Sequence, residues 1–374
     1  MTMLKRLTRR WPKDAPLQVL PPLRWAEQKP TYREAEPAII EAALARSQRR
    51  PSGNWYAFAA GSAIRGNRPF GTSVAGVEIV AWRDRHGGLV VGPGTCPHLG
   101  ADLSTGSIDC GTLICPWHGL KLTGKREFGW KPLPSHDDGV LAWVRLDRVG
   151  GEEPLDAPIV PERPSGNQLH AVTRLVGTCE PADVIANRLD PWHGAWFHPY
   201  SFTQLEVLSA PAPDVGVPPA LLGGRLREEQ RADERLREEQ RADERLREEQ
   251  PPDADSDADR FLVAVTFRMG RFGAPVIAEF TSPEPRTIVM RIVDGEGTGS
   301  VVETHATPLG PGADGRPRTA VLEAVIAHSD RSGFAHALRA APLIAPLMRY
   351  AATRLWRDDL AYAERRFQVR SRPD

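Results

Sequence analysis

Two short segments rich in glycine and proline each carry one cysteine and one histidine. They read Cys96-Pro-His98-Leu-Gly and Cys115-Pro-Trp-His118-Gly. Thiolates and imidazoles are donor groups for zinc and for iron–sulfur clusters. Zinc motifs with two cysteines and two histidines usually pair like ligands along the sequence, whereas each segment here mixes them. The mixed arrangement favours a [2Fe–2S] cluster in which one iron takes both thiolates and the other takes both imidazoles.

A second group of polar side chains lies near the middle of the chain and consists of Asn187, Asp190, His193 and His198. The two imidazoles are five positions apart, so on a regular α-helix they would lie about 140° apart and could not bind one ion. Pro191 and Gly194 allow the backbone to depart from a regular helix. Taken alone, the segment leaves a purely structural reading open, in which Asp190 caps a helix that begins at Pro191.

The cysteine–histidine segments come first along the chain and the group from Asn187 to His198 comes second. The two groups resemble, in the same order, the two motifs of the Rieske non-haem iron oxygenases. The cysteine–histidine segments resemble the Rieske motif, and the segment from Asn187 to His198 resembles the mononuclear-iron motif of the family's hydroxylases and demethylases. Rieske proteins of respiratory complexes carry an additional cysteine in each loop. The matching positions here are Ala101 and Trp117, so the chain looks like the oxygenase type.

The resemblance implies two cofactors. The residues matched to a Rieske [2Fe–2S] cluster are Cys96, His98, Cys115 and His118. The residues matched to a mononuclear Fe(II) are His193, His198 and Asp359. Two imidazoles and one carboxylate leave open positions on the iron for dioxygen.

Three further assignments depend on the same resemblance. Asp359 and Glu364 match the family's D-x₄-E ending, while Asp358 would lie about 100° away on a helix and stays the alternative ligand. Asp190 matches an aspartate thought to link a Rieske histidine of one subunit to an iron-bound histidine of the next. Asn187 matches an asparagine near the iron. We therefore count Asp190 and Asn187 among the catalytic residues.

The rest of the 374-residue chain must position these groups. Short apolar runs separated by turn residues predict a small all-β domain from Trp55 to about Arg148. Strands are predicted near 261–267, 276–280, 287–293, 301–307 and 320–327, before a closing helix over roughly 334–366 with expected breaks at Pro342 and Pro346. This order predicts an α+β fold. The resemblance implies a helix-grip-like catalytic domain, with an antiparallel sheet around the C-terminal helix.

The predicted organisation has four parts. They are an N-terminal arm and helical lead-in over 1–52, a Rieske domain over 53–149, a linker over 150–168 and a catalytic domain over 169–374. Within the last part, a ten-residue charged repeat begins at Arg225, Arg235 and Arg245 and marks a low-complexity insert over 225–259. We interpret the insert as a solvated charged helix or as disorder.

Composition excludes several classes of protein. Basic and acidic residues number 48 each, so no net positive charge favours nucleic acid. Only four cysteines occur, which does not suggest a disulfide framework and fits the cytoplasm. No transmembrane helix is predicted, and a peripheral membrane contact is left open without a motif to support it. The Ala/Leu/Pro-rich stretch over 334–348 is expected either to line an apolar cavity or to pack in the core.

The resemblance implies an oxidoreductase, a Rieske monooxygenase that uses O₂ and external electrons to hydroxylate or oxidatively demethylate an apolar substrate such as a steroid, a carotenoid or an aromatic compound. The chain carries no flavin or nicotinamide fingerprint, so a separate ferredoxin or NAD(P)H-dependent reductase is the expected partner. The family also implies a head-to-tail homotrimer. Two alternatives stay open: a non-enzymatic Rieske electron carrier, and a desaturase of the same fold.

Overall fold

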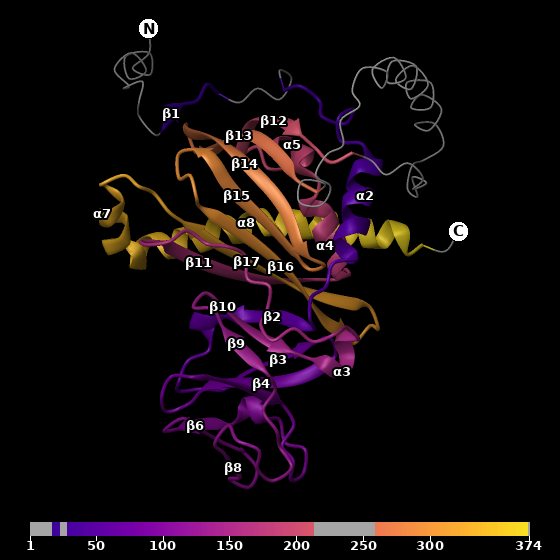
Figure 1. Ribbon diagram of the computed structural model, residues 1–374, viewed down its shortest axis with the longest axis vertical. Coiled ribbons are helices and arrows are strands. Elements are labelled where there is room, and N and C mark those ends of the chain that lie inside the picture. The colour runs from indigo at the N-terminus through magenta and orange to yellow at the C-terminus, as the bar shows by residue number, and fades with distance from the viewer. Residues whose placement is uncertain (1–16, 23–27, 213–258, 373–374) are drawn as a thin grey trace.

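The computed structural model describes residues 17–22, 28–212 and 259–372, which form two parts stacked along the long axis of the molecule (Figure 1). Small sheets at one end comprise residues 55–145, here called the N-terminal β-region. A large sheet with helices occupies the other end. The charged repeat predicted over 225–259 lies outside the described residues, apart from Asp259.

Short antiparallel strands joined by tight turns build the N-terminal β-region, in three sheets of three strands each. The strands are β2 (Trp55–Ala60), β3 (Phe70–Val74), β4 (Val77–Arg83), β5 (Leu89–Pro93), β6 (Ser107–Asp109), β7 (Thr112–Ile114), β8 (Lys121–Leu122), β9 (Ser135–Asp137) and β10 (Leu141–Arg145). Because strands this short are unstable alone, burial of shared side chains must hold them. Trp82 and Trp130, with ring centroids 5.6 Å apart, pack against Cys96 and Cys115 and so form a rigid base beneath both cysteines.

The large antiparallel sheet has the strand order β11-β17-β16-β15-β14-β13-β12, with β1 (Gln18–Val19) paired to β14. Its other strands are β11 (Leu169–Gly177), β12 (Phe202–Ser209), β13 (Phe261–Met269), β14 (Phe272–Glu284), β15 (Thr287–Gly295), β16 (Val301–Pro311) and β17 (Pro317–Ala327). The side chains of Val263, Ile288 and Val321 point to the same face and enter one apolar core with the helices. That face therefore carries the helices, while the opposite face is free to meet the β-region.

Helices cover this face of the sheet, with α8 lying behind the strands in Figure 1. They are α2 (Pro37–Gln48), α4 (Pro181–Arg188), α5 (Gly194–Phe197), α7 (Phe334–Arg339) and α8 (Ala341–Arg370), whereas α3 (Asp147–Gly150) follows the β-region. Val184 and Ile185 of α4 pack with Leu355 and Trp356 of α8 in the core. The core therefore fixes α4 and α8 against each other.

The two prolines of the closing helix behave differently. The predicted break at Pro342 is confirmed, since α7 ends at Arg339 and α8 begins at Ala341. The predicted break at Pro346 is wrong, because α8 continues through it to Arg370. Pro346 donates no hydrogen bond to the carbonyl of Pro342, but both prolines are exposed and water can replace the missing donor.

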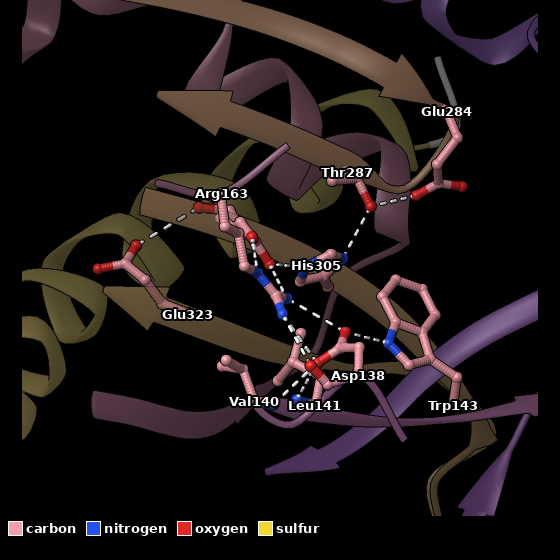
Figure 2. Close-up of polar contacts among 11 residues, drawn as sticks. Asp138, Val140, Leu141, Trp143, Arg163, Glu284, Thr287, His305 and Glu323 are labelled. Atoms are coloured by element: carbon pink, nitrogen blue, oxygen red, sulfur yellow. Dashed lines mark hydrogen bonds and ion pairs between the residues drawn. The ribbon is translucent and has the colours of Figure 1, made fainter. Parts of the chain in front are cut away.

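A buried arginine joins the β-region to the large sheet. Arg163 donates from Nη1 to Oδ1 of Asp138 at 2.9 Å and from Nε to Oε1 of Glu303 at 2.6 Å. Figure 2 shows Trp143 and His305 beside it, and the indole of Trp143 also donates to Asp138, at 2.7 Å. Burial alone would raise the pKa of both carboxyls, but the hydrogen bonds from Arg163 keep each pKa below its usual value. One guanidinium thus holds together two carboxylates from different sheets.

The predicted α+β fold class is confirmed. All five predicted strands of the second half are present, and each is longer than predicted. Strands β11 and β12 were not predicted, although β11 alternates buried and exposed residues over its first half. In the described ranges, no helix combines the length and apolar composition that crossing a bilayer requires. The predicted domain boundaries stay a prediction.

Candidate metal centres

The two cysteine–histidine loops have the same backbone hydrogen bonds. The amide of Cys96 donates to the carbonyl of Ala101 at 2.8 Å, and the amide of Cys115 donates to that of Leu120 at 2.9 Å. In each loop the amide four residues after the cysteine donates to the cysteine carbonyl. The amide of Gly100 donates to Cys96, and that of Gly119 donates to Cys115. These glycines have φ of +80° and +72°, a region that favours glycine. The chain therefore presents both ligand pairs in matching turns.

The donor set within these loops fits a Rieske cluster. Cys96 and Cys115 are 2% and 3% exposed, whereas His98 and His118 lie at the surface with ring centroids 4.9 Å apart. Burial raises the pKa of both thiols, while backbone amides in each loop donate to the sulfur and lower it. Amide donors of this kind stabilise thiolates and tune the potential of an iron–sulfur cluster. Two buried sulfurs and two exposed imidazoles are the ligands that such a cluster requires.

The other centre lies where α4, α5 and α8 meet. Asn187 is near the end of α4, and the chain then makes a 3₁₀ turn over Pro191–His193 before the single turn of α5. His198 follows α5 with φ −121° and ψ 53°, outside the helical region. This break brings His198 back toward His193, which a regular helix would not allow. Asp359 faces both from the middle of α8.

One carboxylate oxygen lies within hydrogen-bond distance of three side chains. Oδ1 of Asp359 lies 2.8 Å from Nε2 of His198, 3.1 Å from Nε2 of His193 and 3.1 Å from Nδ2 of Asn187. The histidine and carboxylate ligand atoms all lie within 4.8 Å of one another. Asp359 is fully buried, and burial alone would raise its pKa, but the hydrogen bonds with the two histidines hold that pKa well below its usual value.

Two buried oxygens in this group have no hydrogen-bond partner in the described part of the chain. They are Oδ2 of Asp359 and Oδ1 of Asn187. Leaving a buried polar atom without a partner costs about 1–3 kcal/mol. Two imidazoles and a carboxylate with a free oxygen are the ligand set of a non-haem Fe(II) site with open positions. The residues present therefore fit a mononuclear iron.

The outer nitrogens of both histidines also have partners. Nδ1 of His193 bonds to the backbone carbonyl of Asp190. Because a carbonyl only accepts, Nδ1 donates to it, and Nε2 is the nitrogen that could bind a metal in place of its hydrogen bond to Asp359. The Asp190 carboxylate is buried, which raises its pKa, and it accepts a hydrogen bond from Tyr362 at 3.3 Å. Its Oδ1 has no partner within the described ranges.

The adjacent acids Asp358 and Asp359 point to different places. Asp358 accepts a hydrogen bond from the Tyr200 hydroxyl, and its Oδ2 lies 3.7 Å from Nδ1 of His198. The side chain of Asp358 is 42% exposed, whereas that of Asp359 is fully buried. The structure therefore puts Asp359, and not Asp358, with the two histidines in the group that could hold a metal ion, while Asp358 lies behind His198. Sequence reasoning missed Tyr200 and Tyr362, since neither lies in a motif that names its partner.

An apolar pocket of about 440 Å³ lies on the helix-covered face of the sheet. Met290, Ile292, Val302 and Val325 are among its walls, together with Phe267. Phe267 stacks on Phe202 at 5.5 Å, and Phe202 lies 6.1 Å from the ring of His198. Aromatic side chains thus connect the pocket wall to the metal-binding group.

The stretch over 334–348 differs from both predictions made for it. It was expected to line an apolar cavity or to pack in the core. Phe334 alone from this stretch is in the pocket wall. Leu343 and Leu347 are instead 75% and 67% exposed. Both predictions are therefore wrong for the greater part of the stretch.

Two family descriptions match the chain. Residues 54–136 match the Rieske [2Fe-2S] domain. Residues 149–218 and 242–374, more than half of the chain, match the family described as a domain of unknown function, DUF5914.

Two curated relatives are similar over shorter stretches. The vanillate O-demethylase oxygenase subunit of Pseudomonas sp. strain HR199 is 27% identical over 181 residues, which are 43% of this chain and 49% of that protein. The oxygenase component of 3-ketosteroid-9-alpha-monooxygenase from Mycobacterium tuberculosis is 31% identical over 70 residues, which are 19% of this chain and 18% of that protein. The chain thus spans about half the length of the first relative and less of the second.

Dicamba monooxygenase bound to dicamba is similar in structure. The TM-score is 0.54 at 15% identity, over 87% of this chain and 92% of that one. At this identity the likeness is one of fold. Together, the comparisons confirm the predicted resemblance to Rieske non-haem iron oxygenases. The Rieske domain match and the group of His193, His198 and Asp359 agree with both predicted cofactors, the Rieske cluster and the mononuclear iron. The comparisons also agree with the prediction of an oxidoreductase.

Proposed function

The chain belongs to the DUF5914 family and carries a Rieske [2Fe–2S] domain, and we propose that it is the terminal oxygenase of a Rieske non-haem iron monooxygenase. The observation that carries this proposal is the group of His193, His198 and Asp359, which Phe202 and Phe267 connect to the wall of an apolar pocket. The proposed reaction inserts one atom of O₂ into a C–H bond of the substrate and reduces the other to water. It consumes two electrons and two protons.

Each centre has a separate set of residues in this proposal. Cys96, His98, Cys115 and His118 would hold the cluster, and His193, His198 and Asp359 would hold the iron. When bound, the cluster supplies electrons and the iron activates dioxygen. Asn187 donates to Asp359 and fixes the orientation of its carboxylate, which leaves Oδ2 free for the metal. Asp190 and the pair of Tyr200 and Asp358 orient the imidazoles through their outer nitrogens.

Electrons must come from outside the chain and pass from the cluster to an iron. The short strands β6 and β8, beside the cluster loops, lie at the far end of the β-region from α5 and the metal-binding group (Figure 1). This separation supports a head-to-tail homotrimer in which the cluster of one chain serves the iron of the next. The Asp190 carboxylate, with one unpaired oxygen, is the proposed link at that junction. A ferredoxin or an NAD(P)H-dependent reductase would supply the electrons.

The pocket supports an apolar substrate. Its walls are chiefly Val, Ile, Met and Phe side chains, and aromatic contacts link it to His198. The relatives are named for vanillate and for a 3-ketosteroid, so we propose an aromatic or polycyclic substrate, with steroids and carotenoids included, and hydroxylation or oxidative demethylation as the outcome. All four cysteines are free, which is in keeping with the cytoplasm as the proposed location.

Metal and sulfide analysis after anaerobic purification tests the proposal. An oxygenase should contain about three irons and two labile sulfides per chain, whereas an electron carrier should contain about two of each. Electron paramagnetic resonance of the reduced protein reports the cluster separately. With a substrate in hand, product mass distinguishes the reactions: hydroxylation adds one oxygen, and desaturation removes two hydrogens. A chain with an intact cluster and no third iron would overturn the oxygenase proposal.

A further inference from the structure

The segment that follows the last strand has an unusual charge pattern. From Arg331 to Arg357 the sequence contains five arginines and neither aspartate nor glutamate. This segment includes α7 and the first half of α8. In a chain whose basic and acidic residues balance overall, it is a concentrated positive region.

One face of the first half of α8 is apolar and uncovered. Leu343, Leu347 and Tyr350 are 75%, 67% and 66% exposed, and their spacing of four and three residues puts them on the same side of the helix. Arg354 and Arg357 continue this row at the same spacing. The outward face of α8 therefore begins with large apolar side chains and ends with two guanidinium groups.

Several of these arginines are available to a partner. Arg339, Arg349 and Arg357 are exposed, and no ion pair involves them in the part of the chain that the structure describes. Arg331 pairs with Glu296 at 2.7 Å, and Arg354 lies over the ring of Tyr200 at 3.8 Å. Arg357 thus continues the row of exposed side chains and Arg339 lies just before α8, whereas Arg349 is on another side of α8 and lines a second pocket with Val172 and Arg174.

The apolar pocket opens beside this surface. Its wall runs from the buried side chains of Ile292 and Val301 to Arg331 and Gly333, which are exposed. The next residue, Phe334, also lines the pocket and is the first residue of α7. In Figure 1, α7 stands at one end of the large sheet, with α8 running away from it behind the strands.

We propose that α7 and the first half of α8 dock on the surface of an anionic lipid bilayer, and that an apolar substrate enters the pocket from the lipid beside α7. A helix with leucine and tyrosine on one side and exposed arginines at both ends of that row fits the boundary between lipid headgroups and acyl chains. Arginines without acidic neighbours add attraction to anionic headgroups. The link to substrate entry rests on the proposed function, whereas docking itself does not.

Co-sedimentation of the whole protein with lipid vesicles tests the docking. The probes are vesicles of phosphatidylcholine alone and vesicles with about one third phosphatidylglycerol. We expect binding to the anionic vesicles, weakened by salt, and little binding to the neutral ones. Leu343→Ser with Leu347→Ser, and separately Arg339→Gln with Arg357→Gln, should each lower the partition coefficient at least about tenfold.

Matched controls keep the test independent of folding and of catalysis. Leu208→Ser with Met269→Ser changes two apolar residues elsewhere that are 47% and 54% exposed. Arg68→Gln with Arg148→Gln removes two exposed arginines, one in the β-region and one in α3. Both controls should bind as the unchanged protein does. The cluster spectrum and the iron content of every variant report folding and the proposed function separately from vesicle binding.

Three results would overturn the proposal. One is an absence of binding to anionic vesicles by the unchanged protein. Another is equal loss of binding in the variants and in their controls. A third comes from light scattering in solution: if Leu343→Ser with Leu347→Ser dissociates the oligomer, the face is an interface between copies of the chain instead.

Discussion

Oδ1 of Asp359 lies 2.8 Å from Nε2 of His198, although 161 positions separate the two residues in sequence. The contact depends on α8, which brings Asp359 from the end of the chain to the irregular segment between α4 and β12. The same oxygen also faces His193, while Oδ2 is buried without a partner within the described residues. Every activity proposed for this chain depends on this one carboxylate.

Asp359→Ala should remove the mononuclear iron and leave the cluster intact, because it takes away the only acid among the three grouped ligands. Iron should fall from about three to about two per chain, with sulfide unchanged. Asp358→Ala is the matched control, since that side chain is partly exposed and points to Tyr200. It should retain about three irons when iron is saturating. The opposite pattern would reassign the ligand to Asp358.

Cys96→Ser and Cys115→Ser should each abolish the cluster, since a hydroxyl is a poor ligand where a thiolate is required. Visible absorption and the reduced-state paramagnetic signal should both disappear. Cys110→Ser supplies the control, because this cysteine is exposed and lies outside the two loops. Loss of the cluster in Cys110→Ser as well would point to general unfolding and would contradict the ligand assignment.

Arg163→Gln should destabilise the protein by about 3–5 kcal/mol at neutral pH, because two buried carboxylates lose their partner. The pKa of Asp138 and of Glu303 are both lowered in the folded protein. Their stabilisation is therefore complete above the unfolded-state pKa of about 4 and is lost as the pH falls through the lower folded-state values. The difference between variant and unchanged protein should shrink in acid.

Urea denaturation at pH 7 and at about pH 2.5, below the unfolded-state pKa values of both acids, measures this difference. Lys29→Gln serves as the control, since Lys29 pairs with Glu34 on an exposed surface and should leave the free energy of unfolding nearly unchanged. A difference between Arg163→Gln and the unchanged protein that stays constant from pH 7 to about pH 2.5 would show that the two carboxylates do not depend on Arg163.

Local sequence predicted the ligands better than it predicted their surroundings. Both cluster loops are contiguous motifs whose glycines and cysteines determine the turn, so their role could be predicted without knowledge of the fold. Arg163, Tyr200 and Tyr362 act on residues far away in sequence, and no spacing rule links them to those partners. Contacts of this kind depend on how strands and helices pack.

Apolar composition also misled the prediction for the stretch over 334–348. Leucines usually indicate a core, but Leu343 and Leu347 stand on the outer face of α8. Pro346 led to a different wrong prediction, that of a break in the helix. A proline on the exposed side of a helix removes one hydrogen bond, which water can replace. Residue types alone did not show which side of the helix faces solvent, because that depends on how the helix packs in the fold.

Asp190→Asn should keep both cofactors and slow electron transfer between them. The amide preserves the size of the side chain and leaves the backbone carbonyl that accepts from His193 unchanged. It removes the negative charge proposed to link two imidazoles. Stopped-flow reoxidation of the reduced cluster by O₂ should be at least about tenfold slower at unchanged iron content. Reoxidation at the original rate would remove Asp190 from the electron path.

Tyr200→Phe should weaken iron binding about tenfold without changing the stoichiometry, because partners of a ligand's outer nitrogen typically contribute this much to metal affinity. The hydroxyl donates to Asp358 and lies 3.4 Å from Nδ1 of His198, so its loss frees both side chains to move. Competition with a chelator at several iron concentrations measures the affinity. Tyr350→Phe is the matched control on an exposed face of α8 and should have no effect. Equal affinities in the two variants would show that Tyr200 does not orient His198.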